Sequence, residues 1–329
     1  MGKILGAALA ATLIGGAALA QQRERLPAEC RQEIAALCRG ADAGFRACIR
    51  TALPKLSDVC RKAIGERGAS APPPPGTREL AYGADPKQKL DLMLPANATR
   101  APLILFVHGG GWSIGDKRTG AGVKAAHFTG QGWAFASANY RLVPQATVEQ
   151  QAADIAAAIA WARANAAAQG LDPDRVVLMG HSAGAHLVAL VGTDPRYLAA
   201  AGVPMNAVKG VILLDGAGYD IAAQMARPGN PVAGMYDAAF GKDVARQKAL
   251  SPTLHAAAPN AARWLILPID RRDDSKAQSE GLAAALRPAG ASASVVAVPG
   301  ESHASLNKGL GEAGDFATGE VDKFLAGLK

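Results

Sequence analysis

The sequence predicts an α/β fold in which a mostly parallel sheet carries helices on both faces, preceded by a small helical hairpin stapled by disulfides. Short apolar runs alternate with Ala-rich amphipathic stretches over most of the chain. All four cysteines of the 329 residues fall between Cys30 and Cys60. Four consecutive prolines, Pro72 to Pro75, separate the two regions, because no helix can continue through them.

The predicted strands are short apolar runs bounded by Gly, Pro or charged residues. Helices are expected between several of them, most clearly over residues 148–168 and 278–286, where the apolar positions have helical spacing. Residues 79–82 and 89–94 alternate apolar and polar side chains, as an antiparallel edge does. The parallel strands are expected over residues 103–107, 133–138, 176–179, 211–214, 264–267 and 295–298.

Composition and charge exclude some classes of function. The chain is 49% hydrophobic, which is enough for one large core and a small appended module. Its formal charge of +7 comes from 35 Lys and Arg against 28 Asp and Glu, and the basic residues are scattered. Because nucleic-acid binding needs many cationic groups gathered on one face, we expect no nucleic-acid partner.

The first twenty residues have the order of a secretory signal. Lys3 precedes an uncharged apolar stretch over residues 4–20, which ends in small residues, Ala18 and Ala20, at the expected cleavage site. An uncleaved membrane anchor is the alternative, but the stretch is short for a span and contains two glycines. We expect cleavage after residue 20 and an exported protein, periplasmic or secreted, that keeps no stable membrane span.

Residues 21–68 form a cysteine-rich segment. In an exported protein such clustering indicates disulfides, and the helical spacing of the apolar residues predicts a hairpin. Three connectivities are possible, of which nested pairing, Cys38 with Cys48 and Cys30 with Cys60, would staple the hairpin. A zinc site is the alternative, disfavoured because the cysteines include no tight pair. The sequence leaves the partner of this segment, if it has one, unidentified.

The pentapeptide Gly-His-Ser-Ala-Gly at 180–184 lies between the strand expected over 176–179 and a helical run over 186–191. In that context Gly-x-Ser-x-Gly forms a sharp turn that lifts the serine hydroxyl above the sheet, and small flanking residues let the backbone turn. An ordinary glycine-rich turn is the alternative, which this placement disfavours. Ser182 is therefore the candidate nucleophile.

A second glycine-rich motif, His-Gly-Gly-Gly-Trp at 108–112, follows the strand expected over 103–107. Three glycines leave backbone N–H groups accessible, so that they can bind the oxyanion of a tetrahedral intermediate together with the amide of Ala183. A phosphate-binding loop is the alternative. The motif lacks the lysine and the spacing of a P-loop.

With both motifs in place, residues 77–329, beyond a linker over 69–76, resemble the α/β-hydrolase superfamily. Within it they resemble the HGGGW-type esterases, both the hormone-sensitive-lipase-like and the feruloyl-esterase or deacylase-like enzymes. The resemblance extends to Asn-Tyr-Arg-Leu-Val-Pro at 139–144 and Asp-Pro-Asp-Arg at 172–175. It implies an α/β-hydrolase catalytic domain with Gly110, Gly111 and Ala183 as oxyanion donors, and it implies neither metal nor cofactor.

The general base must be a histidine that follows Ser182, because triads of this fold run Ser, acid, His along the chain. His186, His255 and His303 qualify. His186 lies one helical turn past Ser182 and is expected in the core, and His255 precedes a strand. His303 follows the last expected strand, at the position that the resemblance also implies, so it is the candidate base.

Three carboxylates, Asp270, Asp273 and Asp274, lie in the loop after the strand expected over 264–267. The related enzymes often carry an aspartate followed by a small residue and a helix beginning Ala-Gln, which Asp274 and the residues after it match. Asp274 is therefore the candidate acid and Asp270 the next choice. Pro-Ile at 268–269 stands where these enzymes often have His-Gly, which leaves the geometry of this loop open.

These features predict an exported serine carboxylic-ester hydrolase that acts on a small-molecule ester through an acyl-enzyme. Short acyl chains are expected, because the chain has few aromatics and no long apolar insertion able to form a lid. An amidase, formamidase or peptidase with the same triad is the alternative, since motifs do not fix the leaving group. A catalytically inert binding protein is a further alternative, which the intact motifs disfavour.

Overall fold

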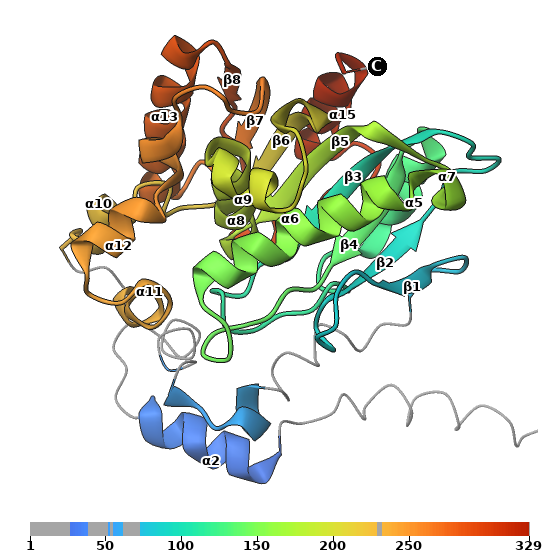
Figure 1. Ribbon diagram of the computed structural model, residues 1–329. Coiled ribbons are helices and arrows are strands. Elements are labelled where there is room, and N and C mark those ends of the chain that lie inside the picture. Colours follow the sequence, from blue (N-terminus) through green and yellow to red (C-terminus); the bar gives the residue numbers. More distant parts are fainter. Residues whose placement is uncertain (1–26, 39–51, 53–54, 62–72, 229–231, 329) are drawn as a thin grey trace, which may run out of the picture.

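The computed structural model describes residues 27–38, 52, 55–61, 73–228 and 232–328. In these ranges eight strands form a sheet with the order β1-β2-β4-β3-β5-β6-β7-β8 (Figure 1). The pairs β1–β2 and β2–β4 are antiparallel, and every other pair is parallel. The prediction of an α/β-hydrolase fold with a mostly parallel sheet is confirmed.

The strands follow the predicted apolar runs, with small shifts at their ends. The antiparallel edge consists of β1 (Arg78–Ala81) and β2 (Lys89–Met93), close to the two segments where alternation predicted it. The parallel strands are β3 (Ala101–Val107), β4 (Ala134–Ala138), β5 (Leu171–His181), β6 (Val208–Leu214), β7 (Arg263–Leu267) and β8 (Ser292–Val295).

The last strand differs from the prediction of residues 295–298. Strand β8 lies three residues earlier and pairs with β7 from Ser292 to Val295, while Val298 forms an isolated bridge with Ile269 beyond the strand. Strand β8 is the edge of the sheet, so it needs apolar side chains on one face only. The continuous apolar run that predicts a strand therefore lies after β8, at residues 295–298.

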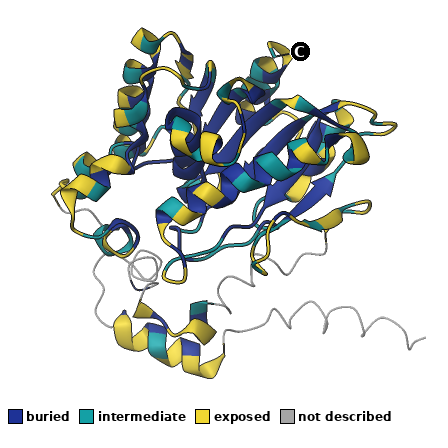
Figure 2. Ribbon diagram, in the orientation of Figure 1, coloured by how far each residue is buried: buried dark blue, intermediate teal, exposed yellow. Residues whose placement is uncertain are grey.

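Helices cover both faces of the sheet, as predicted, and strand β3 shows how the faces divide. Leu103 and Leu105 point to the face covered by α6 (Val148–Ala164), α8 (Ala183–Thr193) and α13 (Asp273–Leu286). Ile104 and Phe106 point to the face covered by α5 (Gly122–Gly130), α14 (His303–Gly309) and α15 (Phe316–Ala326). The central strands of the sheet between these layers are buried, whereas the edge strand β1 is mostly exposed (Figure 2).

The helix boundaries follow local capping chemistry. Helix α6 begins where Thr147 and Gln150 form a reciprocal capping box, and a second helix, α7, continues the predicted stretch after Asn165. Helix α13 begins five residues earlier than the expected start at 278, with Asp273 and Asp274 in its first turn, where carboxylates are favourable. The other helices are α2 (Ala28–Leu37), α7 (Ala166–Gln169), α9 (Pro195–Ala200), α10 (Ile221–Met225), α11 (Ala233–Phe240), α12 (Val244–Ala249), and the 3₁₀ turns η2 (Met205–Ala207), η3 (Pro252–His255) and η4 (Arg287–Ala289).

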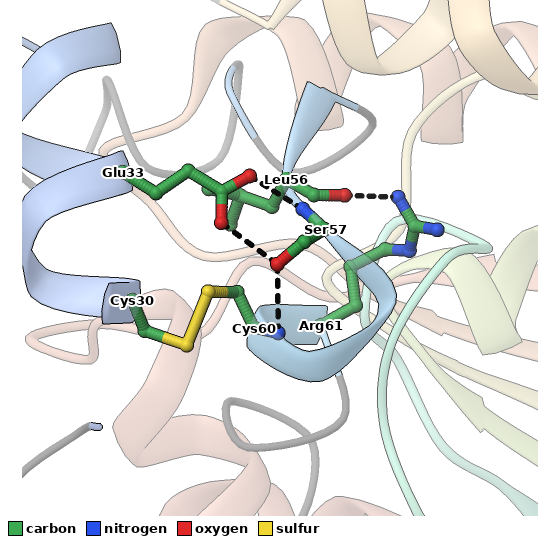
Figure 3. The surroundings of a disulfide bond; sticks show 6 residues. All are labelled: Cys30, Glu33, Leu56, Ser57, Cys60 and Arg61. Carbon is green, nitrogen blue, oxygen red and sulfur yellow. Dashed lines mark hydrogen bonds between the residues drawn. A yellow bond between two sulfur atoms is a disulfide. The ribbon is translucent and has the colours of Figure 1, made fainter. Parts of the chain in front are cut away.

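The cysteine-rich segment forms a small module held by a disulfide between Cys30 and Cys60, as the nested pairing predicted (Figure 3). Beside the bond, the Glu33 carboxylate accepts hydrogen bonds from the backbone N–H and the hydroxyl of Ser57. Cys48 lies outside the described residues, so the Cys38–Cys48 pair stays a prediction. The expected signal over residues 1–20 also lies outside them.

The module contacts the larger α/β domain close to the second glycine-rich motif. Its buried cluster, which includes Ile34 and Leu56, packs against Ile114, two residues after that motif. A long 3.5 Å contact joins the Gln145 amide to the Asp58 carboxylate. Within the described ranges, no helix has both the length and the apolar character needed to cross a bilayer.

Candidate active site

Ser182 occupies the sharp turn between β5 and α8, as predicted. Its backbone has φ 56° and ψ −120°, a left-handed conformation that non-glycine residues adopt only under strain. The Ser182 N–H donates to the carbonyl of Leu214 at 3.0 Å, which ties the turn to the end of the neighbouring strand β6. The serine therefore stands at the carboxyl edge of the sheet, tied to the end of β6.

The second glycine-rich motif passes directly beside the serine. A Cβ added to Gly109 would lie 2.9 Å from the Ser182 Cβ, so no larger residue fits there without a shift of the loop. Ala183 is the first residue of α8, where a backbone N–H has no partner within the helix. The Gly110 carbonyl accepts hydrogen bonds from the N–H groups of Ser113 and Ile114, which turns the loop back on itself. The loop that carries Gly110 and Gly111 thus passes beside Ser182, and Ala183 directly follows it.

Trp112 anchors this loop in the core. Its indole is 2% exposed, and its carbonyl accepts hydrogen bonds from the Val143 N–H at 3.0 Å and the Gln151 amide at 2.7 Å. Helix α11 covers the same loop, because Trp112 packs edge-on against Tyr236 and Phe240. The loop geometry is therefore fixed by packing as well as by hydrogen bonds.

His303 is the first residue of α14, which follows Ser302 as N-cap. Its Nδ1 lies 2.6 Å from Oδ2 of Asp215. Its carbonyl accepts a hydrogen bond from Nε2 of His181 at 2.8 Å, and the two imidazoles lie 4.5 Å apart between centroids. His181, the residue before Ser182, therefore links the strand-to-helix turn to His303. Burial, reinforced by the neighbouring His303, lowers the pKa of His181, so His181 is neutral here.

Asp215 directly follows β6, and its side chain is fully buried. Its Oδ1 accepts a hydrogen bond from the Ile269 N–H at 3.2 Å, and its Oδ2 accepts from His303 and from Nη1 of Arg272 at 2.8 Å. Burial alone would raise the pKa of Asp215. The hydrogen bond with His303 and the Arg272 charge outweigh that penalty and hold the pKa well below its usual range. The carboxylate beside the imidazole is therefore ionised.

The expectation that Asp274 would orient His303 is corrected by the structure, which places Asp215 there instead. Asp274 lies in the first turn of α13, and both of its oxygens accept hydrogen bonds from Arg272. Its Oδ2 also accepts from the Gln224 amide at 3.3 Å. The early start of α13 is the physical reason, because it leaves Asp274 on a helix rather than in a loop that could reach the imidazole.

The other two carboxylates of that loop also make contacts of their own. Asp270 accepts a hydrogen bond from the Gly300 N–H at 3.3 Å. Asp273 has a side chain that is 90% exposed and pairs with Lys276. Neither contacts the imidazole in the described part of the chain.

A sequence signal for Asp215 was present but weak. The aspartate ends the apolar run 211–214 and precedes Gly216, so it lies at the carboxyl edge of the strand next to the one that carries Ser182. It also satisfies the chain order of nucleophile, acid and base. The resemblance implies an acid one strand later, after β7, which is why Asp274 is the candidate from the sequence.

The two other candidate histidines have structural partners. His186 is fully buried in α8, accepts a hydrogen bond from the Trp112 indole at 3.3 Å and donates to the Leu250 carbonyl at 2.9 Å. Burial lowers its pKa to about 4, so it stays neutral, as expected of a core histidine. His255 lies in η3 and contacts the Ala249 carbonyl. Among the described residues, no group of three or more His, Cys, Asp or Glu side chains is arranged to hold a metal ion.

Comparisons with known proteins show which families and structures this chain is similar to. Residues 90–202 match the family model BD-FAE. Esterase LipC of Mycobacterium tuberculosis is 37% identical over 129 residues, which cover 37% of this chain and 32% of that protein. Isoprenylcysteine alpha-carbonyl methylesterase ICME of Arabidopsis thaliana is 39% identical over 115 residues, which cover 34% of this chain and 26% of that protein. The chain thus spans about a third or less of these curated relatives.

Among solved structures, the apo form of Thermogutta terrifontis esterase 2 superposes with a TM-score of 0.63 and 25% identity. The match covers 78% of this chain and 96% of that one. The propionate-bound form of the same esterase gives a TM-score of 0.61 at 26% identity, with the same coverage of 78% and 96%. The chain therefore has the α/β-hydrolase fold, and it is similar to esterases in sequence and structure, with residues 90–202 matching BD-FAE.

Proposed function

We propose that this chain is an exported serine esterase that hydrolyses carboxylic esters of short-chain acids through an acyl-enzyme. Ser182 is the nucleophile, His303 the general base and Asp215 the acid that orients it. The observation that carries the proposal is the 2.6 Å contact between the His303 imidazole and the buried Asp215 carboxylate, beside a serine in a strained strand-to-helix turn.

The contact fixes the form of the imidazole that the reaction needs. Asp215 is ionised and can only accept a hydrogen bond, so His303 Nδ1 carries a hydrogen and donates a hydrogen bond to Oδ2. The Nε2 atom is then left with a free lone pair. It takes the Ser182 hydroxyl proton as the oxygen attacks the ester carbonyl, and it returns that proton to the leaving alkoxide. Water repeats the sequence on the acyl-enzyme.

The buried carboxylate also stabilises the imidazolium that forms during each proton transfer. Charge developing on the carbonyl oxygen needs donors on the other side of the substrate, and the backbone N–H groups of Gly110, Gly111 and Ala183 supply them in this proposal. Removing one donor of such a site lowers kcat by about 10²- to 10³-fold. The rigidity of the loop that Trp112 anchors therefore contributes to rate and not merely to stability.

The side chain that covers the loop 108–112 favours a short acyl group. A Cβ on Gly111 would lie 2.4 Å from Sδ of Met235 on α11, so the methionine lies directly against the oxyanion glycine. Space beside the proposed carbonyl site is thus limited on this side by a large side chain. The related Thermogutta esterase was solved with propionate bound, a three-carbon acid of the size proposed here.

Export is proposed from the sequence order of residues 1–20 and from the disulfide of the module. A bond between Cys30 and Cys60 persists in oxidising compartments and is rare in a reducing cytosol. Fractionation of cells that express the full chain, followed by mass spectrometry of the mature N-terminus, tests this part of the proposal. Recovery of the intact N-terminus with the cytosolic fraction would contradict it.

Labelling with a fluorophosphonate probe tests the catalytic assignment. Mass spectrometry should locate the adduct on Ser182, and Ser182→Ala should abolish both labelling and ester hydrolysis. A panel of matched esters, amides and formamides then separates an esterase from an amidase. Labelling elsewhere, or turnover of the ester panel by Ser182→Ala, would contradict the assignment. Labelling without turnover of any member would contradict the proposal of a working esterase.

A further inference from the structure

Arg272 joins two carboxylates that come from different elements. Its Nη1 donates to Oδ2 of Asp215 at 2.8 Å and lies 3.2 Å from the Asp215 carbonyl oxygen. Its Nε and Nη2 donate to Oδ1 and Oδ2 of Asp274 at 3.3 and 2.9 Å. The guanidinium therefore connects the end of β6 to the first turn of α13.

The arrangement differs from an ordinary surface ion pair. The Asp215 side chain has no exposed surface, and Arg272 is 28% exposed, so the attraction is weakly screened by solvent. Asp274 is held in turn by the Gln224 amide and lies 3.6 Å from Arg227. A planar guanidinium with donors on two edges suits such a bridge, whereas a lysine ammonium would be a single point charge.

The guanidinium also lies against the base itself. Nη1 of Arg272 is 3.1 Å from Nδ1 of His303, and both groups point at the same oxygen of Asp215. Two donors thus converge on one carboxylate oxygen and fix its position. Because the Ile269 N–H holds the second oxygen, the carboxylate has no freedom to rotate away from the imidazole.

We propose that Arg272 is a positioning residue of the Asp215–His303 pair, which fixes the carboxylate oxygen that binds the imidazole and disfavours the uptake of a second proton by the pair. This inference rests on the proposed esterase function. Arg272 touches neither substrate nor reacting atoms in the proposal. Arg272 affects the reaction by holding Asp215 in place, and Asp274 contributes by holding Arg272.

The charges around the pair determine the direction of the pH effect. Besides Arg272, the pair is faced by Asp274 from α13, Arg227 from the segment after α10, and the neutral His181 from β5. Two buried phenols, Tyr219 and Tyr236, lie close enough for their own pKa values to be affected by these charges, and burial raises both of those values. Arg272 is therefore the cation in direct contact with the pair.

The sign of the effect follows from that contact. A cation beside the pair opposes the addition of a proton to it, and the Arg272 charge is one cause of the lowered Asp215 pKa. Removing the cation makes protonation easier. Activity that requires the pair to carry a single proton is then lost at a higher pH than in the parent, so the acidic limb of the pH profile of kcat/KM moves to higher pH.

The test compares Arg272→Met, which removes the charge at similar length, with Arg272→Lys, which keeps the charge but loses the fork. Arg272→Met should lower kcat about tenfold, as expected for the loss of one charge-assisted hydrogen bond, with KM for a short ester unchanged. It should also move the acidic limb up by about one pH unit. Arg272→Lys should keep the acidic limb at the pH of the parent, but its kcat should stay below that of the parent. Arg271→Met is the matched control, because Arg271 is 77% exposed and its ion-pair contact is with Asp270 at 3.9 Å.

Asp274→Asn gives an independent measure, since it leaves Arg272 in place but removes its anchor. The variant should shift kcat in the same direction as Arg272→Met by a smaller factor. An Arg272→Met enzyme with the kcat and the pH profile of Arg271→Met would overturn the inference, and so would a lower melting temperature with an unmoved acidic limb. The fluorophosphonate label is the separate readout for the proposed function. If Arg272→Met labels normally at Ser182 and has unchanged kinetics, the inference about Arg272 fails while the proposed esterase function stands.

Discussion

The Asp215 carboxylate and the His303 imidazole are 88 positions apart in the sequence and 2.6 Å apart in the structure. The contact exists because β6 and the segment before α14 both end at the carboxyl edge of the sheet, beside the turn that carries Ser182. A parallel sheet gathers the ends of its strands at one edge, so residues far apart in the chain can form one site. Because Asp215, and not Asp274, contacts His303, the two aspartates should differ in how much activity their replacement removes.

Asp215→Asn should keep the fold but lower kcat by roughly ten-thousandfold, the loss known for this change in a protease triad, because the amide stabilises the wrong imidazole tautomer. Asp274→Asn should have a much smaller effect, since Asp274 reaches the pair through Arg272. Asp273→Asn is the matched control on the exposed surface. Steady-state kinetics with circular dichroism of each variant checks the order, and a mild Asp215→Asn beside a crippled Asp274→Asn would reverse our assignment.

Acyl-chain selectivity should depend on Met235. Met235→Ala removes the side chain that lies against Gly111, so the ratio of kcat/KM for an octanoyl ester over an acetyl ester should rise by about tenfold, the low end of what a changed apolar pocket supplies. Met205→Ala in η2, at the opposite end of β6, is the control for truncating a partly buried methionine. A Met235→Ala enzyme with the parent's chain-length profile would show that the acyl group binds elsewhere.

The pH dependence of stability should contain a contribution from Lys124. This side chain is fully buried on α5, donates hydrogen bonds to the carbonyls of Gly120 and Asn307, and lies over the Phe106 ring. Burial lowers its pKa to about 7, against a smaller opposing effect of Asp315. Between about pH 7 and pH 10.5 the unfolded chain therefore binds one more proton than the folded chain.

The free energy of unfolding should accordingly rise with pH across that window, by up to about 1.4 kcal/mol per pH unit from this group. Lys124→Met should remove the contribution and flatten the profile, while Lys308→Met, an exposed change on α14, should leave it. Urea denaturation at several pH values measures the slope. Parallel profiles for the parent and Lys124→Met would show that Lys124 is charged in the folded protein.

Deletion of the chain through Pro75 should leave an active enzyme, because Ser182, His303 and Asp215 all lie after the linker. The deletion also uncovers Ile114, so the shortened chain should associate more readily than the parent. Ile114→Thr in the shortened chain should reduce that association without changing turnover. Fluorophosphonate labelling and sedimentation measure the two effects separately. A soluble, folded truncation that does not label would show that the module completes the site.

The sequence contained enough information for the architecture because the core of an α/β fold requires continuous apolar strands separated by amphipathic helices. The turn at Ser182 was predictable because it depends on a short local pattern. The Cys30–Cys60 pair was predictable because four cysteines allow only three connectivities. The position of the edge strand β8 was predicted three residues too late, because one of its faces needs no apolar side chain. Local patterns therefore predict buried elements better than edges.

The acid of the proposed triad was predicted wrongly for a different physical reason. Its identity depends on which strand end reaches the imidazole, and that depends on where α13 begins. Two acidic residues in the first turn favour an early helix start, which moves Asp274 away and places Arg272 between it and the pair. A similarity to other enzymes supplied the position of the acid, whereas the helix start in this chain decided it.

The left-handed backbone at Ser182 implies that the protein is less stable than its fold allows. Holding a non-glycine residue at φ 56° and ψ −120° is unfavourable by about 1–3 kcal/mol, and glycine accepts that conformation without strain. Ser182→Gly and Ser182→Ala both lack the hydroxyl, so both should be inactive, yet the glycine variant should melt at the higher temperature. Selection for turnover at this position therefore opposes selection for thermal stability, and an inactive descendant of this chain would be free to become the more robust protein.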